Sequence, residues 1–141
     1  MTVHLIKLCV GIDSVDQLRE EQARRLDALR RQGREPVLIH WTRHAPHRAE
    51  EVLDGGSLYW VIHGAVAARQ PLLGIERRDG VEGEKRCALI LSPELIETVP
   101  VHWRPFQGWR YLDPVEAPPD LREHDDMPPE MARDLRLLGL I

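Results

Sequence analysis

The chain has 141 residues, of which 43% are hydrophobic and 30% charged, and its formal net charge is −4; this is typical of one globular domain with a sizeable core. No run reaches the roughly 20 apolar residues of a membrane span, and the N-terminus lacks a secretory pattern, so we expect a cytoplasmic protein that does not enter a membrane. The acidity is uneven, because residues 113–130 carry seven acidic side chains and one basic side chain.

The first third of the chain predicts a strand, a helix, a second strand and a second helix. Residues 2–10 are rich in β-branched and aliphatic side chains, as strands are. A helix of about 14–32 should follow, because Asp13 or Ser14 is a good N-cap and Gly33 a good terminator. Residues 35–42 predict the second strand, and Pro46 predicts the start of a short helix over about 46–54.

The most informative stretch runs from Asp54 to Gln70. We expect a helix to end at Gly55 and Gly56, since residues without a Cβ can adopt positive φ there. A long apolar strand then begins and carries no charge until Arg69. Residues 72–75 continue it after a break or bend at Pro71, and a polar hairpin follows near Gly80. Further strands are predicted at residues 86–91 and 93–102, followed by an aromatic segment at 104–112.

This order of elements predicts an α+β fold. The strand-like runs after residue 56 have hairpin-length connections, and one further helix follows them. We expect a curled, mostly antiparallel sheet, or a small β-barrel, packed against two or three helices. Residues 1–112 should form a single globular domain. Residues 113–141 should form an acidic, proline-rich arm that ends in a short docking helix at about 131–138.

One set of side chains combines aromatic faces with planar hydrogen-bond donors. Bases stack on aromatic rings with about 1–3 kcal/mol each, and guanidinium groups bind phosphates through paired hydrogen bonds. The candidate ligand-binding residues are Trp41, Arg43, Tyr59, His63, Arg69, Gln70, Gln107, Trp109 and Arg110, with Tyr111 beside them. Within this set, we predict that Arg69 and Gln70 lie next to Trp109 and Arg110. The structural alternative places Trp60 and Trp109 in the core and pairs Arg69 with Glu50 or Glu51.

No motif in the chain specifies a reaction. His40, His44 and His47 have helical spacing for a metal, but the strand pattern at 37–39 and Pro46 argue against a helix there, so we predict no metal site. Phosphate-binding loops, dinucleotide fingerprints and nucleophile elbows are absent, so no cofactor is predicted. Cys9 and Cys87 are expected to be buried thiols.

Two other classes of function remain open. A small hydrolase would use His63 with a nearby acid such as Glu50 or Glu51. A structural or interaction protein would use the C-terminal arm to wrap a neighbour, and a homodimer could form in this way.

Residues 48–62, together with Ala68-Arg69-Gln70 and residues 106–112, resemble a bacterial family, domain-of-unknown-function family 1489. Residues 5–11 resemble the opening of that family, so the resemblance covers essentially the whole chain, and it implies no activity. The order of elements is also similar to that of the PUA-like group of small β-barrels, which includes ASCH and EVE domains. Members of that group bind RNA or modified nucleotides, and some are hydrolases. This similarity implies an RNA- or nucleotide-binding module as the leading hypothesis.

Overall fold

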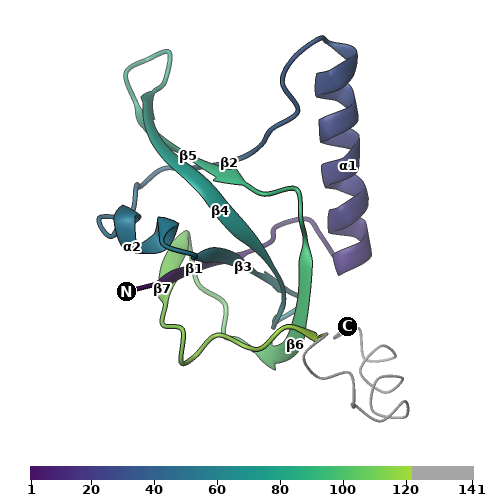
Figure 1. Cartoon of the computed structure of the whole chain (residues 1–141), viewed down its shortest axis with the longest axis vertical. Helices are drawn as coiled ribbons and strands as arrows, with labels where there is room; N and C mark the ends of the chain where they lie inside the picture. The colour runs from purple at the N-terminus through teal and green to yellow at the C-terminus, as the bar shows by residue number, and fades with distance from the viewer. Residues whose placement is uncertain (122–141) are drawn as a thin grey trace.

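The computed structural model describes residues 1–121 (Figure 1). In this part of the chain, seven strands form one curled sheet, and two helices pack against it. In chain order the elements are β1 (His4–Leu8), α1 (Val15–Arg31), β2 (Leu38–Thr42), α2 (Ala49–Leu53), β3 (Ser57–Ile62), β4 (Ala65–Asp79), β5 (Lys85–Leu91), β6 (Ile96–His102) and β7 (Trp109–Leu112). The helix predicted at 131–138 lies outside the described residues.

The strands follow the order β2-β5-β4-β3-β1-β7, and β6 joins the sheet beside β4. Within residues 1–121, β1 and β3 form the one parallel pair, and the other pairings are antiparallel. The path of strands ends at β2 and β7, so the sheet is an open curl rather than a closed barrel. The predicted α+β fold with a curled, mostly antiparallel sheet is therefore confirmed.

The sheet bends along β4, the long strand that crosses the centre of Figure 1. The first half of β4 pairs with β3 on one side and with β6 on the other. The second half pairs with β5, and the register shifts between Leu72 and Gly74. Pro71 lies between the halves and does not end the strand. One strand therefore connects two differently oriented parts of the sheet.

The prediction of one uninterrupted strand from residue 57 to residue 70 is wrong. β3 ends at Ile62, and the chain reverses through His63 and Gly64, whose φ angles are 52° and 74°. Ile62 pairs with Ala65 across this turn. Two consecutive positive φ angles give a two-residue hairpin turn whose twist matches that of the strands. Because apolar residues lie on both sides of the turn, the hydrophobic pattern reads as one continuous strand and does not indicate the turn.

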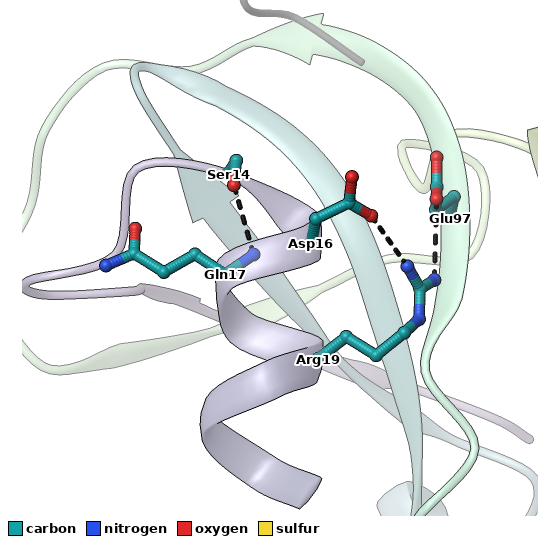
Figure 2. Close-up of polar contacts among 5 residues, drawn as sticks. All are labelled: Ser14, Asp16, Gln17, Arg19 and Glu97. Carbon is teal, nitrogen blue, oxygen red and sulfur yellow. Dashed lines mark hydrogen bonds and ion pairs between the residues drawn. The ribbon is translucent and has the colours of Figure 1, made fainter.

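The start of α1 is capped and connected to β6, as Figure 2 shows. The Oγ of Ser14 accepts a hydrogen bond of 3.0 Å from the backbone N–H of Gln17, as the sequence predicts for an N-cap. Arg19 donates to Asp16 on the helix at 3.0 Å and to Glu97 on β6 at 3.4 Å. Exposed ion pairs of this kind contribute less than about 1 kcal/mol each, so they orient the helix more than they stabilise it.

A stronger connection lies at the middle of α1. Gln22 and Gln70 of β4 exchange two amide hydrogen bonds of 2.8 Å each, and both side chains are buried. The indole N–H of Trp60 donates to the Oε1 of Gln70 at 2.9 Å, and the Nε2 of Gln70 donates to the carbonyl of Ser92 at 3.0 Å. Both polar side-chain atoms of Gln70 thus have partners inside the protein. This network joins α1 to β4 and β4 to the segment after β5.

Part of the predicted acidic arm contacts the sheet. The backbone N–H of Val99 on β6 donates to the carbonyl of Pro119 at 2.9 Å, and Thr98 forms a β-bridge with Asp120. Ala117 packs against an apolar cluster that includes Phe106 and Leu112. A separate arm over residues 113–141 stays a prediction, because residues 122–141 are not described.

Candidate functional site

A groove of about 1230 Å³ lies between the loop after β2, the β4–β5 hairpin and β7. Three aromatic side chains line it, namely Trp41, Trp109 and Tyr111. Five cationic residues also line it, namely Arg43, Arg77, Arg78, Lys85 and Arg86. They face two carboxylates, Asp79 and Glu84, so the groove is positively charged although the whole chain is not.

Trp41 is the aromatic centre of the groove. Its side chain is 39% exposed, and the guanidinium of Arg86 lies 4.4 Å from the ring centroid. Arg78 lies 5.7 Å from the same centroid. Trp41 pairs with Ala88 across β2 and β5, which places it diagonally to Arg86 on the same face. The register therefore brings an indole and two guanidinium groups together.

The lining residues come from both faces of this edge of the sheet. Thr42 follows Trp41 on β2 and pairs with Cys87, which in turn pairs with Arg77. Directly opposed residues share a face, and successive residues alternate between faces. Thr42 and Arg77 are therefore on the opposite face to Trp41. The groove extends past the edge strand β2 and borders both sides of it.

The two aromatic residues of β7 hold the loop after β2. The indole N–H of Trp109 donates to the carbonyl of His44 at 2.8 Å, and the hydroxyl of Tyr111 accepts from the backbone N–H of Arg48 at 3.0 Å. The two rings meet edge to face with centroids 5.0 Å apart. These contacts fix one wall of the groove before any ligand binds. Trp109 is partly buried against the main apolar cluster, whereas the structural alternative places it in the core.

Most of the cations in the groove have no anionic partner among residues 1–121. Within residues 1–121, Arg43, Arg77, Lys85 and Arg86 form no salt bridge. Arg78 pairs with Glu76 two residues before it on β4, with an Nε–Oε2 distance of 3.1 Å. The groove therefore offers several guanidinium and ammonium groups to an anionic ligand.

Arg69 and Gln70 are not part of this groove. The Nε and Nη2 of Arg69 donate to Asp120 at 2.7 and 2.8 Å, and its Nη1 donates to Ser57 at 2.9 Å. This guanidinium holds the pKa of the Asp120 carboxyl below its usual range. Arg69 thus has the internal partner that the structural alternative required, but the partner is Asp120 and not Glu50 or Glu51. Gln70 is completely buried.

The predicted contact of Arg69 and Gln70 with Trp109 and Arg110 is not formed. Arg69 pairs with Tyr59, Tyr59 with Ile6, and Ile6 with Arg110, so β3 and β1 lie between the two arginines. Three strand spacings separate them, or roughly 14 Å. The guanidinium of Arg110 lies 5.0 Å from the ring centroid of Phe106, on the face opposite to Trp109.

The remaining predicted residues are dispersed. Tyr59 is buried, and its ring meets that of His4 edge to face at 5.0 Å. Gln107 is exposed in the loop before β7. Of the candidate set, the structure brings Trp41, Arg43 and Trp109 together, with Tyr111 beside them.

His63 does not meet the acids that the hydrolase hypothesis names. Its Nε2 lies 3.2 Å from the Oδ1 of Asp13, and both side chains are more than half exposed. Glu51 instead forms an ion pair with Arg48. A catalytic use of His63 would therefore depend on Asp13, in an open position outside the groove.

Residues 1–121 contain no group of three or more His, Cys, Asp or Glu side chains arranged to hold a metal ion. His40 lies on β2, whereas His44 and His47 lie in the loop that follows, so their helical spacing is not realised. Cys87 is buried and Cys9 is partly buried, and both are free thiols. No helix in this described part has the length and hydropathy needed to cross a membrane.

Sequence reasoning missed four cations of the groove, namely Arg77, Arg78, Lys85 and Arg86. The sequence predicts a polar hairpin near Gly80 but assigns no role to the charged residues on its two arms. The available signal was the symmetry of charge around the hairpin, with Arg77-Arg78 before it and Lys85-Arg86 after it. Antiparallel pairing of such arms necessarily brings cations together, as Arg78 opposite Arg86 shows.

The chain belongs to the family described as protein of unknown function (DUF1489), which matches residues 5–141. The resemblance to this family noted in the sequence is thereby confirmed, whereas the similarity to PUA-like domains stays a prediction. The chain matches no curated protein and no solved structure.

Proposed function

We propose that this protein is a binding module for single-stranded RNA or nucleotides, and that the groove around Trp41 is its binding site. In this proposal a base stacks on Trp41, and phosphates bind the cations on the two sides of β2. Base stacking on an exposed aromatic ring is tolerant of sequence, and arginine binds phosphate through two parallel hydrogen bonds. The module would therefore recognise the backbone and the flat faces of bases rather than a sequence.

The observation that carries the proposal is the position of Arg78 directly opposite Arg86, beside Trp41. Like charges opposite each other destabilise a strand pair. Glu76 offsets one of the two charges, and Arg86 has no carboxylate partner within residues 1–121. A bound phosphate would provide the missing counter-ion.

The dimensions of the groove support a chain-like ligand. Its volume of about 1230 Å³ exceeds the roughly 300–1,000 Å³ of ordinary small-molecule pockets. The net charge of −4 on the whole chain opposes long-range attraction of nucleic acid, so affinity should be modest and should fall steeply with salt.

The test is fluorescence anisotropy with a labelled single-stranded RNA of about ten nucleotides, within the usual footprint of such modules. Trp41→Ala should weaken binding by about 1–3 kcal/mol, because one stacked base is lost. Arg86→Ala should weaken it by about 1.5–3 kcal/mol through the loss of a charge-assisted contact. Competition by unlabelled adenosine monophosphate distinguishes a nucleotide site from one that needs a longer strand.

Arg110→Ala is the matched control. Arg110 is exposed and stacked on an aromatic ring, as Arg86 is, but it lies on the face away from Trp109. The Arg110→Ala variant should bind RNA with the same affinity as the parent protein. Equal losses of RNA affinity in the Arg86→Ala and Arg110→Ala variants would mean that RNA is attracted by charge in general and not by the groove. If the parent protein does not bind RNA at low salt, the proposal is wrong.

A further inference from the structure

A second hollow, separate from the groove, lies between α1 and the sheet. It has a volume of about 400 Å³ and is lined by α1, by the end of β1 with the loop after it, and by β2. Trp60 of β3 and Leu91 of β5 also line it. His40 lines this cavity and Trp41 lines the groove, and the two side chains lie on opposite faces of β2. The volume is at the lower end for small-molecule sites.

Some polar groups in the cavity wall already have partners. Gln22 is bonded to Gln70, and the indole N–H of Trp60 donates to the same Gln70 side chain. On the α1 side, the carboxylate of Glu21 pairs with Arg24 and Arg25. These groups build the wall and need no ligand.

Two other groups in the wall, the ammonium group of Lys7 and the Nε2 of His40, lack partners among the described residues. Lys7 is partly buried and lines the cavity, and its ammonium group forms no hydrogen bond or ion pair within residues 1–121. The Nε2 of His40 is buried and has no hydrogen-bond partner among the described residues. An unsatisfied nitrogen of this kind is uncommon in a folded protein and calls for an explanation.

Lys7 and His40 converge on one aromatic side chain. Lys7 is directly opposite Trp60 in the pairing of β1 with β3, so their side chains share a face. The ring of His40 meets the ring of Trp60 edge to face, with centroids 5.1 Å apart. An ammonium group, an indole and an imidazole thus border the same small space.

We propose that this cavity binds a small organic anion, whose apolar part lies against Trp60 and Leu38 and whose carboxylate or phosphate is bound by Lys7. Arg25 also lines the cavity on the α1 side, but its Nε lies 3.7 Å from the Oε1 of Glu21, so its charge is offset and the anion depends on Lys7. Burial, followed by the charges of Lys7 and Arg25, lowers the pKa of His40 to about 4, so the imidazole is neutral at physiological pH. A ligand atom that reached its Nε2 would satisfy the unpaired nitrogen.

The experiment is a two-dimensional NMR titration of the amide and indole signals of the full chain with three small compounds that share a phenyl ring. Phenyl phosphate and benzoate carry the two kinds of anionic group, and benzyl alcohol is their neutral counterpart. The proposal expects the anions to shift the signals of Lys7 and the Trp60 indole, and benzyl alcohol to bind more weakly. The anion that binds with the higher affinity identifies the anionic group that the cavity prefers.

Two variants separate ligand binding from structure. Lys7→Met should weaken binding of the preferred anion about tenfold or more and leave benzyl alcohol unchanged. His40→Phe keeps the ring contact with Trp60 and removes the unsatisfied nitrogen, so it should raise the melting temperature while weakening anion binding. Arg110→Ala should leave all three titrations unchanged.

Shifts confined to the Trp41 indole and the groove would overturn the proposal, because the anions would then be bound elsewhere. Unchanged anion affinity in both Lys7→Met and His40→Phe would overturn it as well. Neither result would affect the RNA assay, which depends on Trp41 and Arg86.

Discussion

Arg69 on β4 holds the carboxylate of Asp120 through two parallel hydrogen bonds, Nε–Oδ1 at 2.7 Å and Nη2–Oδ2 at 2.8 Å. Both side chains are about one-fifth exposed, so the pair is largely shielded from solvent. Because truncation of one partner leaves the other charge poorly compensated, Arg69→Ala should lower the free energy of unfolding by about 2–4 kcal/mol. Urea unfolding monitored by tryptophan fluorescence measures this loss.

Asp120→Ala and the double variant complete a thermodynamic cycle for this pair. A coupling energy above about 0.5 kcal/mol would confirm that the two side chains stabilise the fold together. Arg110→Ala, which removes an exposed arginine with no carboxylate partner within residues 1–121, should stay within about 0.5 kcal/mol of the parent. If Arg69→Ala unfolds like the parent, the pair is not structural and Arg69 becomes available to a ligand.

The pairing of Arg69 illustrates what the sequence does not contain. Asp120 lies 51 residues from Arg69, in a segment whose prolines and acids predict little packing. Nothing local distinguishes Asp120 from the other acids around it. The class of fold, by contrast, follows from local patterns such as the N-cap at Ser14, and these survive in the structure.

Local sequence patterns predict only part of the candidate site, because the rest depends on how the strands pair. Trp41 and Arg43 lie at the end of a predicted strand, where side chains reach the rim of a sheet, and they do line the groove. The sequence prediction places Trp109 and Arg110 in one site although they are neighbours on a strand. Alternation places such neighbours on opposite faces, and the structure has them so. The cationic hairpin needed the register of β4 with β5, which depends on the bulge near Gly74.

The two glycines before β3 have different physical roles. Gly55 has a φ of +82°, whereas a Cβ on Gly56 would lie 2.1 Å from the carbonyl oxygen of Val52 and 2.5 Å from that of Val3. Gly56→Ala must therefore displace backbone and should cost about 3 kcal/mol or more. Gly55→Ala meets no atom closer than 3.9 Å and should cost only the roughly 1–2 kcal/mol of an unfavourable φ.

Thermal or urea unfolding of the two alanine variants compares these costs directly. The order of stability should be parent, then Gly55→Ala, then Gly56→Ala. Equal destabilisation would mean that the backbone approach at Gly56 is relieved easily, and the junction of α2 with β3 would be less constrained than the distances indicate.

The buried His40 should make stability depend on pH between about 6.5 and 4. Burial, then the charges of Lys7 and Arg25, lowers its pKa to about 4, while the unfolded chain titrates near its ordinary value of 6.5. Between these values the unfolded chain binds more protons, so stability falls as the pH is lowered, by roughly 3 kcal/mol in total. Burial, followed by Arg69, also lowers the pKa of His4, which acts in the same direction.

Urea unfolding of the parent and of His40→Phe at pH 7 and near pH 4.5 tests this dependence. The variant should lose much less stability on acidification, because Phe does not titrate. The contribution of the Arg69–Asp120 pair is separable, since the lowered pKa of Asp120 makes that stability disappear only at more acidic pH, below the ordinary pKa of the carboxyl. An equal loss in parent and variant would assign the effect to other groups.

The salt dependence of RNA binding should distinguish the phosphate contacts of the groove from its stacking contacts. Each phosphate neutralised on a single strand adds about 0.7 to the slope of log K against log salt concentration. Arg43 lines the groove without an ion pair within residues 1–121, so Arg43→Ala should reduce that slope by about 0.7. Trp41→Ala should lower the affinity at every salt concentration and leave the slope unchanged, because stacking releases no counter-ions. Arg110→Ala should change neither quantity. Anisotropy titrations at four salt concentrations provide the slopes, and a slope that Arg43→Ala leaves unaltered would remove this arginine from the binding surface.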